Sequence, residues 1–243
     1  MKVRIKYSKT GPVKFISHLD VMRYFQKAIR RAELDIKYST GMSPHQIISF
    51  AAPMPLMMES VGEYCDAEFE SVTTSDDIIE RFNNVGSPFI KMIDIVELPD
   101  DAINSMAAVT ASDYLVTLTD KGIAFYKDYF QLDDSEIQEK VSQAIEDLKG
   151  EDSINVLKKT KKSEVVTDIK PLIYDLNFRN NGIYMLLATG SHENIKPENV
   201  LTALCDKFGT EYDKFMYNVL RLETYFGDKK TGFKPLSEAG NRF

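Results

Sequence analysis

The chain contains no tryptophan and only two cysteines among its 243 residues. Cys65 and Cys205 are far apart in the sequence, and each lies in an apolar pattern, which indicates buried, reduced thiols instead of a disulfide. Two cysteines cannot supply a three-cysteine iron–sulfur cluster. The cysteine content therefore excludes a disulfide-stapled scaffold and a radical enzyme that works alone.

Long apolar runs are also missing. The longest unbroken apolar stretches are a few residues, far short of the ~20 residues that a membrane-spanning helix needs. The opening segment, M-K-V-R-I-K, alternates as a strand does and does not form the apolar core of a signal peptide. We therefore expect a cytoplasmic protein with no membrane partner.

Motifs for common catalytic sites are absent. The chain has no glycine-rich phosphate loop, no G-x-S-x-G elbow and no histidine or cysteine spacing typical of a metal site. We therefore expect no metal and no cofactor, and a protein that is not an enzyme. A histidine acting alone as a base needs none of these motifs, so it stays open as the alternative.

The charge of the chain is unevenly distributed. The net charge is −7, yet residues 1–50 carry +7 and the remaining residues carry −14. Such a division favours one face that meets an anionic partner. Attraction between the two parts of the chain, or simple solvation of the charges, is the alternative.

Hydrophobic periodicity predicts two copies of one order of elements. In the first copy we expect strands over 3–7, 13–16 (as part of a hairpin), 36–39, 46–51, 63–70 and 89–96, with helices over 18–32 and 76–84. In the second copy we expect strands over 114–119, 165–178, 183–188 and 216–226, with helices over 135–149 and 197–208, and either a strand or a basic loop over 154–162.

This order predicts an α+β fold of two tandem ferredoxin-like βαββαβ units, because each sheet can bury one face under its two helices. We expect a basic N-terminal domain over 1–100 and a second domain over 112–226. Residues 227–243 show no periodicity, which is typical of a flexible tail.

The first predicted helix has a clear start and two faces. Ser17 and Asp20 form a pattern typical of a capping box. Apolar residues at helical spacing predict an inner face made of Leu19, Met22, Phe25, Ile29 and Ala32. Four cationic residues fall on a different face and form what we call the basic ridge: Arg23, Lys27, Arg30 and Arg31.

Two of the three histidines lie in the basic N-terminal block. His18 stands at a helix start, where the positive end of the helix lowers the pKa of an imidazole and attracts phosphate. His45 follows Pro44 in a loop in which Gly41 permits a close approach of a phosphate or a base. Local hydrogen bonding of His18 and a simple turn around His45 are the alternatives, and we expect His192 to be exposed.

These features together predict a binding site for nucleic acid. Guanidinium and ammonium groups neutralise phosphates, and tyrosines such as Tyr7, Tyr24 or Tyr38 could stack on unpaired bases. Helix charges that are only solvated would give the same pattern. The predicted site residues are Lys9, Lys14, His18, Arg23, Lys27, Arg30, Arg31, Lys37, Tyr38, Gly41 and His45.

Several segments resemble a bacterial family usually called radical SAM-linked or radical SAM-associated proteins. They are K-Y-S-K-T-G-P-V-K-F-I-S-H-L-D-V-M-R, Y-S-T-G-M-S-P-H-Q-I-I-S-F, P-M-P-L-M-M-E-S-V-G-E-Y-C-D-A-E-F, D-I-K-P-L-I and G-S-H-E-N-I-K-P-E-N-V-L, so the resemblance extends from about residue 2 to residue 205. The family's loop usually reads G-F-N-P-H-P. Here Gly41, Pro44 and His45 are retained, whereas Met42, Ser43 and Gln46 differ.

The resemblance implies a partner. Members of that family occur alone or fused behind a radical SAM module, and this chain resembles the form that stands alone. A fainter likeness, at the level of the fold only, is to CRISPR repeat-processing endoribonucleases. That likeness implies a histidine, His18 or His45, that deprotonates a ribose 2′-hydroxyl in metal-free RNA cleavage.

We therefore expect a non-catalytic RNA-binding module, with tRNA or ribosome-related RNA as candidates, that works with a radical SAM protein. The alternatives are a metal-independent, histidine-dependent endoribonuclease and a protein–protein adaptor that binds no RNA. The strongly acidic composition after residue 50 weighs against the endoribonuclease.

Overall fold

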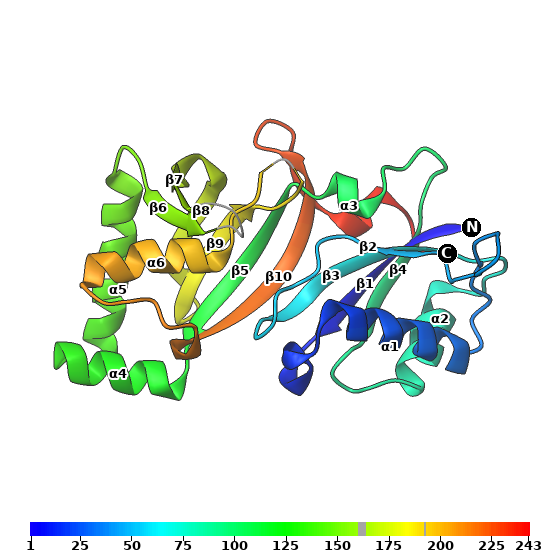
Figure 1. The fold of residues 1–243 in the computed structure, drawn as a ribbon, viewed down its shortest axis with the longest axis horizontal. Helices are drawn as coiled ribbons and strands as arrows, with labels where there is room; N and C mark the ends of the chain where they lie inside the picture. Colours follow the sequence, from blue (N-terminus) through cyan, green and yellow to red (C-terminus); the bar gives the residue numbers. More distant parts are fainter. Residues whose placement is uncertain (160–163, 192) are drawn as a thin grey trace. The chain divides into compact units, whose positions relative to one another are not determined.

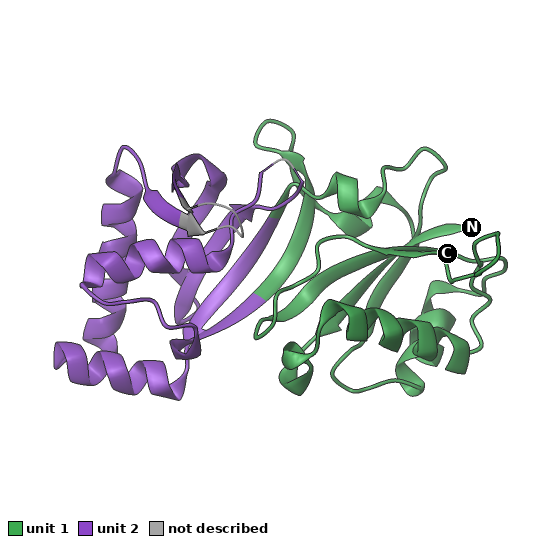
Figure 2. Cartoon of the chain, in the orientation of Figure 1, with its two compact units in different colours: residues 1–111, 221–243 green, residues 112–220 purple. Residues whose placement is uncertain are grey.

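The computed structural model describes residues 1–159, 164–191 and 193–243. The chain forms two compact units, coloured separately in Figure 2: unit 1 comprises residues 1–111 and 221–243, and unit 2 comprises residues 112–220. The fold is α+β, as predicted, with six α-helices in the described residues. His192 and residues 160–162 of the predicted strand or basic loop lie outside the described residues.

Unit 1 is built on antiparallel strands. Its elements are β1 (Lys2–Lys9), a 3-10 helix (Gly11–Phe15), α1 (His18–Arg31), β2 (Ile48–Phe50), β3 (Glu59–Glu68), α2 (Ser75–Asn84), β4 (Met92–Glu97), α3 (Ser105–Ala108), β11 (Gly232–Pro235), a 3-10 helix (Leu236–Ala239) and most of β10 (Tyr217–Asp228). The strand order is β4-β1-β3-β10, with β2 paired to β3 and β11 paired to β10. β1 is antiparallel to both of its neighbours, so Ile5 faces Cys65 on one side and Ile95 on the other.

The core of unit 1 lies between these strands and two helices. α1 and α2 cover the same face of the sheet (Figure 1). Phe25 of α1 and Phe82 of α2 are fully buried, and their rings lie 5.1 Å apart between centroids. They pack against Ile5 and Ile95, which are also fully buried. Burial of such side chains contributes about 1.5–3 kcal/mol each, which fixes α1 firmly on the sheet.

Parts of the prediction for unit 1 are wrong. The expected hairpin strand at 13–16 is a 3-10 helix, because Pro12 has the fixed φ that suits a first helical turn. The expected strand at 36–39 makes only single bridges, from Ile36 to Phe69 and from Tyr38 to Gln46. Leu19 was expected on the inner face of α1, yet it is 55% exposed. The helical spacing of the buried residues Val21, Phe25 and Ala28 places Leu19 outside their face.

Unit 2 has a second group of strands covered by helices. Its elements are β5 (Ala111–Leu118), α4 (Asp120–Phe130), α5 (Asp134–Gly150), β6 (Asn155–Lys159), β7 (Glu164–Asp168), a 3-10 helix (Lys170–Leu172), β8 (Ile173–Arg179), β9 (Gly182–Ala188), α6 (Pro197–Phe208), a 3-10 helix (Lys214–Met216) and the start of β10. The strand order is β10-β5-β9-β8, and β6 and β7 form a separate two-stranded sheet.

In unit 2 the structure confirms one predicted turn and shows that one predicted strand is divided in two. The R-N-N-G turn joins β8 to β9 as predicted, with Asn180 and Asn181 both at positive φ, 53° and 57°. The single strand expected over 165–178 is divided into β7 and β8. Pro171 causes the break, because it lacks the N–H that a strand ladder needs and starts a 3-10 turn instead.

The prediction of a flexible tail over 227–243 is wrong. β11 pairs with β10, where Tyr225 is opposite Pro235. Leu236 is fully buried against Tyr64, and Asn241 bridges to Glu97. Periodicity did not reveal this segment, because β11 is only four residues long and the contacts of Leu236 and Asn241 are made to distant parts of the chain.

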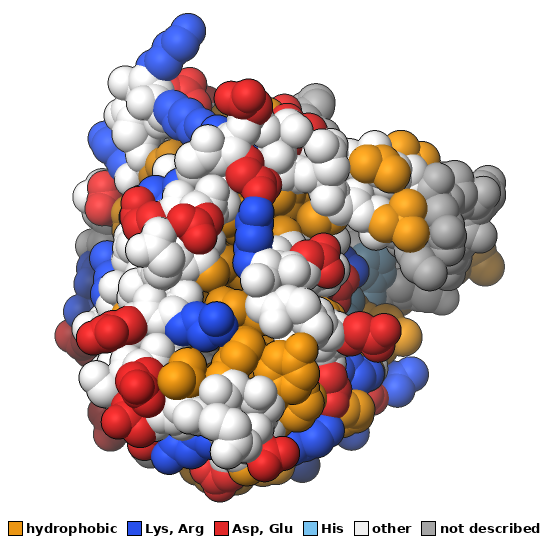
Figure 3. Space-filling model, turned by 90° about the vertical axis from the view of Figure 1, so that its left-hand side faces the viewer, with side chains coloured by type: hydrophobic (Ala, Val, Ile, Leu, Met, Phe, Trp, Pro, Cys, Tyr) orange, Lys and Arg blue, Asp and Glu red, His pale blue; other side chains and the backbone are white. Residues whose placement is uncertain are grey.

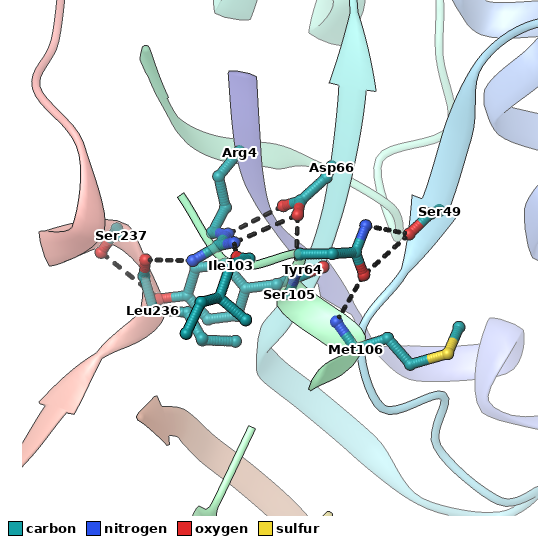
Figure 4. A network of polar contacts seen from close by, with 10 residues as sticks. Arg4, Ser49, Tyr64, Asp66, Ile103, Ser105, Met106, Leu236 and Ser237 are labelled. Atoms are coloured by element: carbon teal, nitrogen blue, oxygen red, sulfur yellow. Dashed lines mark hydrogen bonds and ion pairs between the residues drawn. The ribbon is translucent and has the colours of Figure 1, made fainter. Parts of the chain in front are cut away.

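A buried arginine holds the end of the chain in place (Figure 4). Arg4 forms a fork with Asp66, with Nε–Oδ1 at 2.8 Å and Nη2–Oδ2 at 3.1 Å. The same guanidinium donates to the carbonyl oxygens of Leu236 at 3.2 Å and Ile103 at 2.9 Å. Asp66 also accepts a hydrogen bond from the backbone N–H of Ser105 at 2.6 Å. The Arg4 side chain is 1% exposed, so its charge acts in the interior and not at a surface site.

In the described part of the chain, no helix combines the length and the apolar character needed to cross a membrane.

Candidate nucleic-acid interface

The start of α1 is fixed by its own side chains. Ser17 Oγ accepts a hydrogen bond from the N–H of Asp20 at 3.2 Å, and Asp20 Oδ2 accepts one from the N–H of Ser17 at 3.3 Å. This is the predicted capping box, and it is confirmed. Hydrogen bonds from Ser17 also hold the pKa of Asp20 below its ordinary value. Because the cap uses N–H groups of the first turn, the helix start is less available to phosphate than expected.

The basic ridge lies on the solvent side of α1. Its four side chains, Arg23, Lys27, Arg30 and Arg31, are all exposed. Arg23 is 67% exposed and lies 3.6 Å from a carboxylate oxygen of Asp20. Among the described residues, the other three have no carboxylate within ion-pair distance. The ridge is therefore a cationic surface whose charge is balanced mainly by solvent ions.

The loop that carries His45 is anchored beside α1. The Gln46 side-chain nitrogen donates to the backbone carbonyl of Gln26 at 3.3 Å, near the middle of the helix. The Ser39 N–H donates to the carbonyl of His45 at 2.8 Å, which closes the loop. His45 Nδ1 is 2.9 Å from the Ser39 hydroxyl, an arrangement that orients the ring and leaves Nε2 to a ligand. The structure therefore brings the loop of His45 next to the basic ridge.

The tip of this loop is open to solvent. Gly41 has φ +122°, in the range that favours glycine, and an added Cβ would meet nothing within 4 Å. Met42 is fully exposed, and Tyr38 is 46% exposed. Of the three tyrosines considered for base stacking, Tyr38 alone is available. Tyr7 is 2% exposed, and Tyr24 packs edge-on against Phe82.

Lys9 and His18 do not lie at this surface. They are part of a buried cluster of charged groups that also contains Glu63 and Arg221. Lys9 is 3% exposed, and its ammonium donates to the carbonyl of Ile16 at 3.2 Å. Burial lowers the pKa of Lys9, and the nearby carboxylate of Glu63 opposes this shift. The expectation that Lys9 binds phosphate at the surface is therefore wrong, because β1 directs its side chain into unit 1.

His18 lies on the edge of the same cluster. Its ring packs edge-on against Phe50, with centroids 5.1 Å apart. Burial lowers the pKa of His18, Glu63 acts in the opposite direction, and Lys9 lowers it further. The predicted direction of the shift is correct, but its main cause is desolvation and not the helix end. The imidazole is therefore neutral near neutral pH.

The centre of the cluster is an ion pair that the sequence did not predict. Arg221 Nη1 donates to Glu63 Oε1 at 2.8 Å, with the side chains 5% and 4% exposed. Arg221 Nη1 also donates to the carbonyl of Ala52 at 2.7 Å. Glu63 is the first residue of the strand predicted over 63–70, and Arg221 comes from the other end of the chain. The pair joins residues 158 positions apart, so no local signal could identify it.

Two further predicted lysines have partners of their own. Lys37 Nζ is 3.0 Å from Glu68, and hydrogen bonding to this carboxylate raises the pKa of Lys37. Lys14 Nζ lies 5.6 Å from the ring centroid of Phe15, which is 59% exposed. Lys37 is therefore partly neutralised, whereas Lys14 with Phe15 offers a cation beside an exposed aromatic ring.

The fold and this surface define an α+β protein with an exposed basic helix and a glycine-containing loop beside it. Residues 2–197 match the model of a bacterial family described as "Uncharacterized protein conserved in bacteria (DUF2344)", and the chain belongs to this family. The match agrees with the expected kind of bacterial family, while the link to radical SAM proteins and the likeness to CRISPR endoribonucleases stay predictions.

The other comparisons add little. No curated protein matches the chain. Among solved structures, a dye-decolorizing protein from V. cholerae is similar at 10% sequence identity, over 98% of this chain and 94% of that chain. Its TM-score of 0.19 is too low to support a statement about the fold.

Proposed function

We propose that unit 1 is a non-catalytic module that binds single-stranded RNA through the basic ridge and the loop of residues 38–46. One observation carries this proposal. The four ridge side chains are exposed on one helix, and only Arg23 has a carboxylate within ion-pair distance among the described residues. Phosphates that replace the solvent ions around such groups release them, which favours binding.

The neighbouring loop would supply the contacts to bases. Tyr38 is half exposed and can stack on an unpaired base, and the Gly41 backbone leaves room for a nucleotide to approach. His45 offers a ring nitrogen for a hydrogen bond. The footprint is narrower than the sequence predicted, because Lys9 is buried and Lys37 is paired with Glu68.

The proposal includes a partner. A binding module without catalytic motifs is consistent with presenting RNA, such as tRNA or ribosome-related RNA, to a radical SAM enzyme. The support is the resemblance of the N-terminal segments to radical SAM-associated proteins and the match to a conserved bacterial family over residues 2–197.

We further infer that both units have the ferredoxin-like topology. In unit 1 the elements follow the order βαββαβ, with β1 between β4 and β3 and with β2 antiparallel to β3. Unit 2 follows the same order if α4 and α5 count as one helical segment and the β6–β7 hairpin as an insertion. Its strand order, β10-β5-β9-β8, matches that of β4-β1-β3-β2.

Fluorescence anisotropy with a labelled single-stranded RNA tests the RNA proposal. We expect affinity to fall between about 50 and 200 mM salt, with a log–log slope of about 0.7 per phosphate contact. Alanine at Arg23, Lys27 or Arg30 should each reduce the slope by about 0.7. Lys127→Ala and Lys149→Ala remove a cation from exposed ion pairs of unit 2 and serve as controls.

The result that would overturn the RNA proposal is an unchanged affinity in the triple variant of Arg23, Lys27 and Arg30, or no binding at low salt. Co-purification of a protein partner that resists nuclease, with no RNA retained, would favour the adaptor instead.

The endoribonuclease remains a second candidate on one observation, the lowered pKa of His18 beside Lys9. A neutral imidazole can accept a proton from a ribose hydroxyl. The candidate predicts RNA cleavage in EDTA that is lost in His18→Ala or His45→Ala. Intact RNA after incubation with the wild-type protein would exclude it.

A further inference from the structure

We infer that unit 2 binds an amphiphile with one alkyl chain and an anionic head, of the fatty-acid class, in a cavity under α4, α5 and α6. The inference does not depend on the proposal for unit 1. It starts from a cavity of about 400 Å³. Folded interiors contain few voids larger than a water molecule, and ligand pockets typically measure about 300–1,000 Å³. The volume of this cavity therefore falls within the range of ligand pockets, and its lining decides what it could bind.

The walls of the cavity are mostly apolar. Val116 and Ile183 line it from the strands, and Phe130, Val141 and Leu204 line it from the three helices. Figure 3 looks onto the end of unit 2 where these helices lie and shows apolar surface in a hollow between charged side chains. An alkyl chain in this cavity would make dispersion contacts with the apolar walls. It has no hydrogen-bonding groups of its own that would be left without a partner. A peptide would bury backbone N–H and C=O groups against them, which is unfavourable.

The interior offers no charge to a ligand. The lining includes two buried tyrosines, Tyr126 and Tyr217, whose hydroxyls lie 2.6 Å apart. Burial raises the pKa of Tyr126 to about 12, and it raises that of Tyr217 strongly as well. Cys205 lies 3.1 Å from the Tyr217 hydroxyl. These neutral groups satisfy one another, so a charged head has to remain at the mouth of the cavity.

The charged residues at the mouth of the cavity determine whether a positive or a negative head group can bind there. Two charged residues line the cavity, Asp134 and Lys140. Asp134 is neutralised by Lys127, at 2.9 Å. Lys140 Nζ lies over the ring of Phe130, 4.6 Å from its centroid, and no carboxylate of the described residues is within ion-pair distance. The unbalanced charge beside the apolar walls is therefore positive, which fits a carboxylate.

Titration calorimetry with saturated fatty acids tests the inference. We expect saturable binding of dodecanoate and about a fourfold gain in affinity for each methylene added between octanoate and dodecanoate. Val141→Trp should abolish binding by filling the cavity, while Gln143→Trp, on an exposed position of the same helix, should retain it. Thermal melts check that both variants fold, and Leu204→Phe replaces Val141→Trp if that variant does not.

The head group is tested separately. Lys140→Ala should weaken dodecanoate binding about two- to fivefold, as for an exposed ion pair, and leave dodecanol binding unchanged. Lys149→Ala, on the same helix, should alter neither. Affinity that does not depend on chain length, or that survives in the folded cavity-filling variant, would overturn the site. Tighter binding of dodecyltrimethylammonium than of dodecanoate would overturn the anionic head.

Discussion

The carboxylate of Glu63 and the guanidinium of Arg221 meet in the interior of unit 1, 2.8 Å apart, with no more than 5% of either side chain exposed. Glu63 comes from β3 and Arg221 from β10, two neighbouring strands of the sheet. Lys9 and His18 both respond electrostatically to this carboxylate. Glu63 is therefore the anion that Lys9, His18 and Arg221 share.

Removing Glu63 should destabilise the protein strongly. In Glu63→Ala the Arg221 charge stays buried without its partner, and loss of one partner of a buried pair costs about 3–5 kcal/mol. Urea unfolding followed by circular dichroism measures this loss. The double variant Glu63→Leu/Arg221→Met removes both charges and should recover most of the stability.

The matched control is Glu146→Ala, which breaks the exposed pair with Lys149 and should change stability by less than about 1 kcal/mol. Equal effects of Glu63→Ala and Glu146→Ala would contradict the account of the buried cluster.

The stability of the protein should depend on pH through His18. The folded-state pKa of His18 lies below the ordinary value of about 6.5, so below that pH the unfolded state binds more protons. The contribution of His18 is therefore complete above about pH 6.5 and is lost as the pH falls toward the folded pKa. The difference in unfolding free energy between wild type and His18→Gln should shrink over this range.

Nuclear magnetic resonance titration of the His18 ring gives an independent measurement. In Glu63→Gln the pKa of His18 should fall further, because the carboxylate that opposes the shift is gone. A rise of the pKa in this variant, or a constant difference in stability from pH 7.5 to 5.5 (limits about one unit either side of the ordinary histidine value), would contradict the placement of His18 beside Glu63.

Leu236 should matter as much as a residue of the main core. It is fully buried against Tyr64, and its carbonyl accepts a hydrogen bond from Arg4. Leu236→Ala should lower the free energy of unfolding by about 2–5 kcal/mol, as for other buried leucines. Lys230→Ala, in the exposed turn before β11, is the control. A negligible effect of Leu236→Ala would restore the interpretation of this segment as a loose tail.

Replacing Gly62 and Gly150 by alanine should change the stability of the protein in different directions. At Gly62 in β3 an added Cβ would lie 2.5 Å from the Cα of Glu223, so the backbones of the two strands would have to separate. We expect a loss of about 1–3 kcal/mol, typical of overpacking. At Gly150, the end of α5, nothing lies within 4 Å, and alanine should be neutral or stabilise by up to about 1 kcal/mol. Thermal unfolding of both variants makes the comparison.

The sequence predicted those parts of the candidate site that local physics determines. The capping box of Ser17 and Asp20, the extent of α1 and the exposure of the basic ridge all follow from residues within a few positions of one another. The same holds for the Asn180–Asn181 turn. Each of these features depends on short-range hydrogen bonds or on helical spacing. It can therefore be predicted without the tertiary structure.

Features that depend on distant partners could not be predicted in this way. Lys9 follows Ile5 and Tyr7 at the period of two that strands have, so the alternation of β1 places it on the inner face with these buried residues. Its basic character led to the wrong prediction of a surface site, and only the structure shows that Glu63 is the carboxylate near it. The pairing of Lys37 with Glu68 is likewise visible only once Lys37 is hydrogen-bonded alongside β3.

One missed element had a signal in the sequence. α4 was not expected, although Thr119 accepts a hydrogen bond from Gly122 as a helix cap, and Ile123, Tyr126 and Phe130 recur at helical spacing. Gly122 within the first turn obscured this pattern, because glycine is a poor helix former. α4 supplies two aromatic residues, Tyr126 and Phe130, to the cavity of unit 2.

The discontinuity of unit 1 also sets an order of events during translation. A ribosome that has made residues 1–111 has produced β1, β3 and Glu63, but not the arginine that neutralises it or the leucine that covers Tyr64. Unit 2 is continuous, so all of its residues are made before residues 221–243. Until residues 221–228 emerge, the nascent N-terminal segment therefore holds Glu63 without its arginine partner and β3 without its neighbour β10. A stalled chain would present this unpaired edge of β3 to chaperones.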